Sequence, residues 1–150
     1  MTAKQIAWVD EESHYTDIIR EILTDDGHAV DFYDNSHLGC EGLQVKLYDV
    51  IVTNALLAPD TRVGSNHRLE FGGLPTGVLD LVCRIRAEGP NRETPIVVFT
   101  SYGSLAPGKI TPQLEEMVKS LKATGKTEVV SFSDVNYVQF TEEVLGKYLK

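Results

Sequence analysis

The sequence has few cysteines and no long hydrophobic run, and each absence excludes a class of protein. The 150 residues include two cysteines, Cys40 and Cys83, too few for a disulfide scaffold and too far apart for a paired-thiolate metal site. We therefore expect buried, reduced thiols. No segment approaches the roughly 18–20 apolar residues of a membrane span, and residues 1–6 lack the apolar core of a signal peptide. The sequence therefore predicts a cytoplasmic protein.

Positive charge is also scarce, since 14 Lys and Arg residues stand against 22 Asp and Glu residues, for a net charge of -8. A negative field of this size disfavours binding to nucleic acid or to an anionic membrane. Proteins or small cationic molecules are the partners that this charge favours.

Recognisable catalytic and metal-binding patterns are missing as well. The histidines have neither metal-ligand spacing nor a Ser or Cys partner in a catalytic phrase, so we expect them on the surface or in loops: His14, His28, His37 and His67. No nucleophile–base pair, cofactor fingerprint or Walker-type phosphate loop occurs. We therefore expect no enzymatic activity.

What the sequence does have is a regular alternation of short apolar runs and segments with helical periodicity. We expect strands over residues 4–9, 29–33, 48–53, 95–99 and 128–132. We expect helices over residues 13–24, 36–47, 77–88, 114–121 and 140–148. Five strand–helix units favour a parallel sheet with helices on both faces, because parallel strands need crossover connections. The fold-class prediction is therefore α/β, a single domain over residues 1–150 with a doubly wound, five-stranded, flavodoxin-like (βα)5 sheet.

Two segments fit this pattern less well. In the 36–47 helix, Leu38, Leu43 and Leu47 are the candidate inward residues, but Gly39 and Gly42 interrupt the helical pattern. The connection over residues 58–76 is long for a compact domain and rich in Gly, Pro, Asp and Asn. It is either a partner-binding lobe or an insertion without a role.

Polar residues follow three of the apolar runs directly: Asp10 and Glu11, then Asn54, then Thr100. Ligands of such sheets bind beyond the carboxyl ends of the strands, so these residues form the candidate site. Here the chain resembles the receiver domain of two-component response regulators. Four phrases carry the resemblance: Trp-Val-Asp-Glu-Glu at 8–12, Tyr-Asp-Val-Ile-Val-Thr-Asn at 48–54, Arg-Ile-Arg at 84–86 and Thr-Pro-Ile-Val-Val-Phe-Thr-Ser at 94–101.

The resemblance implies a role for each of these positions. In the family, two acidic residues and an acceptor aspartate hold Mg²⁺, the aspartate takes up a phosphoryl group, and a Thr or Ser and a Lys contact that group. In this sequence Asp10 and Glu11 match the acidic pair and Thr100 the hydroxyl position. Asn54 falls on the acceptor, and residues 130–133 contain no Lys-Pro pair.

These departures remove separate parts of the phosphorylation chemistry. A carboxamide is neutral and a poor nucleophile, so Asn54 should not be phosphorylated. Exchanging one of three carboxylates for an amide removes a charge that Mg²⁺ needs, so we expect binding to be weak or absent. Asp10 and Glu11 would then be vestigial or would simply start the following helix, and Thr100 would be a cap or loop hydroxyl. The resemblance therefore implies a degenerate pseudo-receiver that works as a phosphorylation-independent interaction module.

The implied partners are other signalling proteins, a histidine kinase or an output protein among them. A homodimer would use the fourth helix, fifth strand and last helix, here residues 114–132 and 137–149. Because the chain ends at Lys150, we expect another protein to carry the output.

Two alternatives stay open. The strand-end pocket could instead sense a small ligand or a cation. An active receiver could use Thr53, Ser101 or Asp49 as a displaced acceptor, although Asp49 should lie at the opposite end of its strand.

Overall fold

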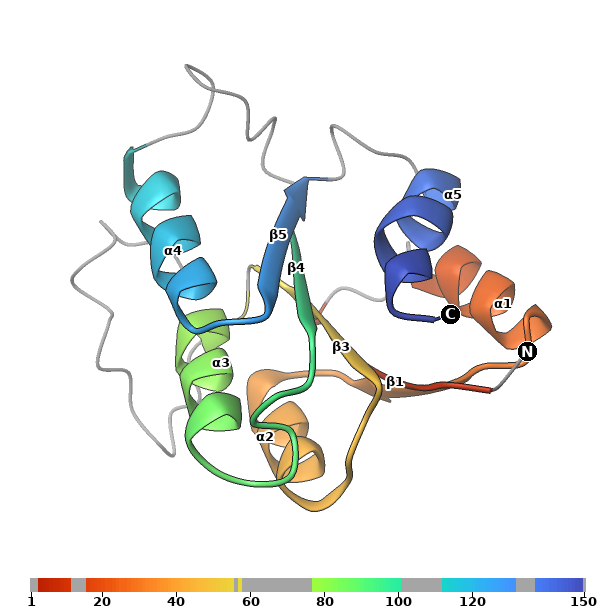
Figure 1. Ribbon diagram of the computed structural model, residues 1–150, viewed down its shortest axis with the longest axis horizontal. Coiled ribbons are helices and arrows are strands. Elements are labelled where there is room, and N and C mark those ends of the chain that lie inside the picture. The colour runs from red at the N-terminus through yellow and green to blue at the C-terminus, as the bar shows by residue number, and fades with distance from the viewer. Residues whose placement is uncertain are drawn as a thin grey trace.

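The computed structural model describes residues 3–11, 16–55, 57, 77–100, 112–131 and 137–149. Its centre is a five-stranded, all-parallel sheet in the order β2-β1-β3-β4-β5 (Figure 1). The strands are β1 (Gln5–Val9), β2 (Ala29–Tyr33), β3 (Val50–Asn54), β4 (Ile96–Thr100) and β5 (Thr127–Ser131). The helices are α1 (Thr16–Asp25), α2 (Ser36–Val45), α3 (Gly77–Ala87), α4 (Pro112–Ala123) and α5 (Tyr137–Gln139). The predicted fold class is confirmed.

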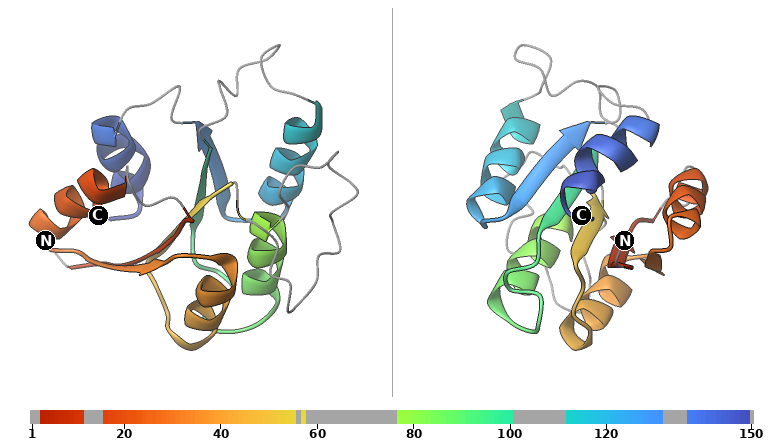
Figure 2. Two further views of the ribbon diagram at one scale, coloured as in Figure 1. Left: turned by 180° about the vertical axis from the view of Figure 1, so that it is seen from behind. Right: turned by 45° about the vertical axis from the view of Figure 1, so that its right-hand side comes forward.

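Helices cover both faces of the sheet, as the two views of Figure 2 show. On one face α2, α3 and α4 pack against a cluster that includes Ile51, Ile96 and Val98. On the other face α1 and the C-terminal helical segment enclose Trp8, which lies fully buried against Phe99 and neighbouring rings. β3 and β4 are buried along their whole length, which explains why they are continuous apolar runs in the sequence.

The end of α1 shows how the chain turns back into the sheet. Gly27 has a positive φ of 88°, its N–H donates to the Thr24 carbonyl, and the His28 N–H donates to the Leu23 carbonyl, each at 3.0 Å. These two bonds form a Schellman motif, which a glycine in the left-handed region closes without strain. The stop at Gly27 is therefore a property of the local sequence.

α2 differs from the expectation in length and in its inward face. It ends at Val45 rather than at residue 47, because Lys46 is extended and leads into β3. Leu43 is buried as predicted, but the prediction for Leu38 and Leu47 was wrong, since their exposed fractions are 41% and 63%. The ten-residue α2 turns only a narrow stripe toward the core, so Leu38 lies outside that stripe and Leu47 lies beyond the end of the helix.

The two glycines of α2 allow the helix to approach the sheet closely. A Cβ at Gly39 would lie 3.0 Å from both Val9 methyl carbons, and a Cβ at Gly42 would overlap the phenol of Tyr33. The Tyr33 phenol cannot move freely, because its hydroxyl is hydrogen-bonded to the Tyr48 hydroxyl. Close packing therefore explains residues that the sequence pattern presents as helix breakers.

Replacing Gly42 with alanine should consequently destabilise the fold despite alanine's higher helix propensity. Overpacking against Tyr33 should lower the free energy of unfolding by about 1–2 kcal/mol in urea titrations. Gly146→Ala is the matched control, because a Cβ there meets only the Thr141 carbonyl oxygen at 3.7 Å. That control should change stability by less than about 0.5 kcal/mol. Equal effects of the two substitutions would contradict the close approach of α2.

Three further expectations are corrected or refined by the structure. Cys40 and Cys83 are free thiols as predicted, but both are half-buried instead of buried. His28 lies in the connection between α1 and β2, as expected, but it is buried, and its Nδ1 accepts a hydrogen bond from the Lys4 N–H at 3.1 Å. The last helix changes character after Gln139, continuing as a π-helix (Phe140–Val144) and then a 3₁₀ turn (Leu145–Lys147). The long connection over residues 58–76 lies outside the described residues, as do His14 and His67.

Candidate functional site

The candidate site lies where the central strands end. Val9 pairs with Thr53 in the parallel register of β1 and β3, so the next residue of each strand, Asp10 and Asn54, come to the same edge of the sheet. The Asp10 N–H donates to the Tyr33 carbonyl at 3.0 Å, which extends the β1–β2 ladder by one residue. The backbone of two neighbouring strands thereby fixes where the Asp10 side chain begins.

Asp10 and Asn54 are joined by a buried hydrogen bond. The Asn54 Nδ2 donates to Asp10 Oδ1 at 3.0 Å, and the two residues are only 3% and 4% exposed. An ionised carboxylate can only accept hydrogen bonds, so the amide must present its N–H to it. A bond to a charged acceptor is stronger than one between neutral groups, particularly away from water. The acceptor position of the resembled family thus carries a donor that is directed at the acidic residue.

The other predicted site residues are placed differently. Thr100, the last residue of β4, is fully buried and pairs with Ser131 in the sheet register. Glu11 is exposed, directly after the buried Asp10. The structure therefore joins Asp10 to Asn54, places Thr100 at the end of the neighbouring strand and leaves Glu11 at the surface. The segment after Ser131, where the family has its lysine, lies outside the described residues.

The arrangement does not fit a magnesium ion, which the resemblance would imply at these positions. Mg²⁺ takes oxygen ligands in a strict octahedral geometry. Asn54 instead directs an amide N–H at the Asp10 carboxylate, where a metal-binding residue would offer an oxygen. Within the described ranges, no group of three or more His, Cys, Asp and Glu side chains could hold a metal ion.

The two displaced-acceptor candidates among the described residues, Asp49 and Thr53, are placed differently from each other. Asp49 lies at the opposite end of β3, where its Oδ2 accepts a hydrogen bond from the Gln5 N–H at 2.7 Å. Thr53 is fully buried, and its Oγ1 donates to the Asn54 carbonyl at 3.2 Å. Ser101 lies outside the described residues. The expected position of Asp49 is confirmed, and neither it nor Thr53 offers an exposed acceptor at the strand ends.

A second feature that the sequence analysis did not predict is an exposed apolar surface on α2. Leu38 and Val45 lie seven residues apart and therefore on one side of the helix, with exposed fractions of 41% and 83%. The signal was present in the sequence, because an apolar residue that a short helix cannot bury must face solvent or a partner. Helical periodicity instead predicts Leu38 in the core.

Comparisons with known proteins identify the fold. No family model and no curated protein sequence matches the chain. Among solved structures, the chemotaxis response regulator CheY4 of Vibrio cholerae matches with a TM-score of 0.70 and 18% identity, over 99% of this chain and 100% of that one. The magnesium-bound receiver domain of sensor histidine kinase PA1611 from Pseudomonas aeruginosa matches with a TM-score of 0.66 and 14% identity, over 99% and 98%.

A CheY-like receiver domain protein from Methanospirillum hungatei matches with a TM-score of 0.67 and 19% identity, over 98% of this chain and 94% of that one. None of the helices in the described ranges has the length and hydrophobicity that crossing a bilayer requires. Nearly full coverage in both directions, together with the strand order, shows that this chain has the CheY-like receiver fold.

Proposed function

We propose that this chain is a receiver-like domain of two-component signalling that acts through protein–protein contacts and is not phosphorylated at Asn54. The observation that carries the proposal is the hydrogen bond from the Asn54 amide to Asp10. The receiver fold supports the signalling role, and the amide supports independence from phosphorylation. The partners of this proposal are a histidine kinase or an output protein in the cytoplasm.

The chemistry of the amide explains why phosphoryl transfer should fail. A phosphoryl acceptor must present an electron-rich oxygen to phosphorus, and a carboxamide is neutral and weakly nucleophilic. At Asn54 the N–H side of the amide also faces the buried Asp10, so rotating the group would set its oxygen against a carboxylate. Phosphoryl transfer depends on cations that neutralise the transferred group, and no lysine occurs in residues 130–133.

Incubation with acetyl phosphate and Mg²⁺, followed by intact-mass measurement, tests the proposal. We expect no added phosphoryl group, while a phosphorylatable receiver treated in parallel gains one. The same negative result is expected with Asp49→Asn and Thr53→Val, since these side chains are not acceptors. Stoichiometric phosphorylation of the wild-type chain, lost in either variant, would replace the proposal with a receiver that uses a displaced acceptor.

A further inference from the structure

Exposed apolar side chains gather on α2 rather than on the surface expected for a homodimer. Among the described residues, the exposed large apolar side chains are Ile18, Leu38, Val45, Leu47 and Val138. Three of these five lie in α2 or within two residues of its end. The described parts of α4, β5 and the last helix contribute Val138 alone. Apolar side chains clustered on one helix are typical of a surface that a partner covers.

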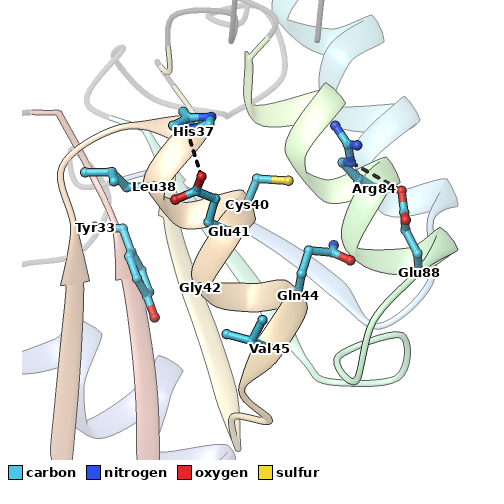
Figure 3. Close-up of a pocket in the computed structure, with 10 residues that line it drawn as sticks. All are labelled: Tyr33, His37, Leu38, Cys40, Glu41, Gly42, Gln44, Val45, Arg84 and Glu88. Atoms are coloured by element: carbon cyan, nitrogen blue, oxygen red, sulfur yellow. Dashed lines mark hydrogen bonds and ion pairs between the residues drawn. The ribbon is translucent and has the colours of Figure 1, made fainter. Parts of the chain in front are cut away.

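Two of these side chains, Leu38 and Val45, border a groove beside α2. The groove has a volume of about 810 Å³ and is open to solvent. Leu38, Cys40, Gln44 and Val45 line it from α2, and Arg84 and Glu88 line it from α3 (Figure 3). A trough that follows a helix and is mostly apolar is the kind of surface on which an amphipathic helix binds.

Two carboxylates lie at the rim of this groove, each beside a basic side chain. His37 Nε2 lies 3.1 Å from Glu41 Oε1 on α2, and Arg84 Nε lies 3.2 Å from Glu88 Oε1 on α3. In both pairs the acid is the more exposed partner, at 65% for Glu41 against 26% for His37, and 58% for Glu88 against 37% for Arg84. The carboxylates therefore face outward on a protein whose net charge is already -8. Electrostatic complementarity calls for a basic partner.

The floor of the groove is held in place before any partner arrives. Tyr33 lies beneath Gly42 and is hydrogen-bonded through its hydroxyl to Tyr48, which donates to Asp31 Oδ2 at 2.8 Å. Lys46 Nζ donates to the same Asp31 oxygen at 2.6 Å. Burial and the hydrogen bonds to Tyr33 and Asp31 raise the pKa of Tyr48 well above its ordinary value, so it remains a donor. A surface fixed in this way loses little conformational freedom on binding.

We propose that the groove over the exposed side of α2, which extends from Tyr33 to Arg84 and Glu88, binds a basic amphipathic helix of a partner protein. The apolar stripe of that helix lies on Leu38 and Val45, and its Lys or Arg residues face Glu41 and Glu88. This inference rests on the proposed function, since it names the surface through which the interaction module works. It replaces the fourth helix, fifth strand and last helix as the partner surface.

Fluorescence anisotropy of a labelled peptide measures the affinity of the groove for such a helix. The probe is a helical peptide with leucines at i, i+3, i+4 and i+7 and lysines elsewhere, and its control has the same composition with the leucines shuffled. We expect the amphipathic peptide to bind at least about tenfold more tightly than the shuffled one. Val45→Asn should weaken binding about tenfold, because it removes an apolar anchor without adding charge. Val138→Asn, the same substitution at another exposed valine, on α5 and outside the groove, should leave affinity unchanged.

Charge reversal provides an independent measurement. Glu41→Lys with Glu88→Lys should weaken binding of the lysine peptide and permit binding of a matched glutamate peptide. The proposal is overturned if neither peptide binds, if the shuffled peptide binds equally well, or if Val138→Asn reduces affinity while Val45→Asn does not. Each of these outcomes leaves the phosphorylation test unaffected, so failure of the groove and failure of the proposed function can be told apart.

Discussion

Replacing Asn54 with aspartate is expected to lower the free energy of unfolding by about 3–5 kcal/mol when divalent cations are absent. The substitution removes the donor that now lies 3.0 Å from Asp10 Oδ1 and puts a second carboxylate in its place. Both positions are nearly inaccessible to water, so the two like charges are poorly screened. Urea unfolding followed by the fluorescence of Trp8, the single tryptophan and a fully buried one, measures the change.

Magnesium should reverse much of this loss in the aspartate variant and have little effect on the wild-type protein. A ligand that binds only the folded state raises its stability, and the variant would present two neighbouring carboxylates, at Asp10 and at position 54. The melting temperature with and without Mg²⁺ is therefore the second measurement. Asn54→Ala is the control, because it removes the hydrogen bond without adding a charge and should not respond to Mg²⁺.

Two results would contradict this account of the site. One is an Asn54→Asp protein as stable as the wild type in EDTA, which would mean that the amide contributes nothing to Asp10. The other is an equal rise in melting temperature with Mg²⁺ for the wild-type and variant proteins. In that case the wild-type site binds the cation despite its amide, and the poor fit of Mg²⁺ argued from the geometry is wrong.

The sheet and the location of the site could be predicted because both follow from local sequence. Buried parallel strands must be apolar on both sides, so β1, β3 and β4 appear as short runs that end abruptly. Since parallel strands end at one edge, the polar residues after those runs had to meet, and Asp10 and Asn54 do. The hydrogen bond between them could not be predicted, because it depends on a register that the sequence does not state.

The errors on α2 have the opposite origin, because they depend on neighbours that are distant in sequence. Helix propensity assigns a penalty to Gly39 and Gly42, but contact with Val9 and Tyr33 makes a side chain at either position unfavourable. Periodicity alone predicts Leu38 and Leu47 inward, but Leu38 lies on a side of the helix that does not face the core, and Leu47 lies beyond the end of the helix. Tertiary packing thus decided which apolar residues became core and which became surface.

Asn91 was missed altogether, because an asparagine in a short connection is typical of any turn. In the structure it is fully buried, and both the nitrogen and the oxygen of its side-chain amide form hydrogen bonds. Its Nδ2 donates to the carbonyls of Leu43 at 2.8 Å and Lys46 at 2.7 Å, and its Oδ1 accepts from the Tyr48 N–H at 2.9 Å and the Thr94 hydroxyl at 3.0 Å. One side chain therefore closes the C-terminal end of α2 and fixes the start of β3.

Asn91→Ala should consequently cost about 3–5 kcal/mol of unfolding free energy, since it leaves several buried backbone groups without their partner. The matched control is Asn35→Ala at the other end of α2, where the exposed Asn35 accepts a single hydrogen bond from the Leu38 N–H at 2.8 Å. Loss of that N-cap should cost about 1 kcal/mol. Urea titrations of the two variants compare the ends of the same helix.

Asn91→Asp separates the shape of this side chain from its hydrogen bonds. The carboxylate keeps an acceptor for Tyr48 and Thr94 but turns its second oxygen toward the carbonyls of Leu43 and Lys46, where a donor is needed. We expect it to be at least as destabilising as alanine, because a buried charge then faces two carbonyl dipoles. If the aspartate variant were as stable as the wild type, the two N–H bonds from Asn91 would not hold the C-terminal end of α2.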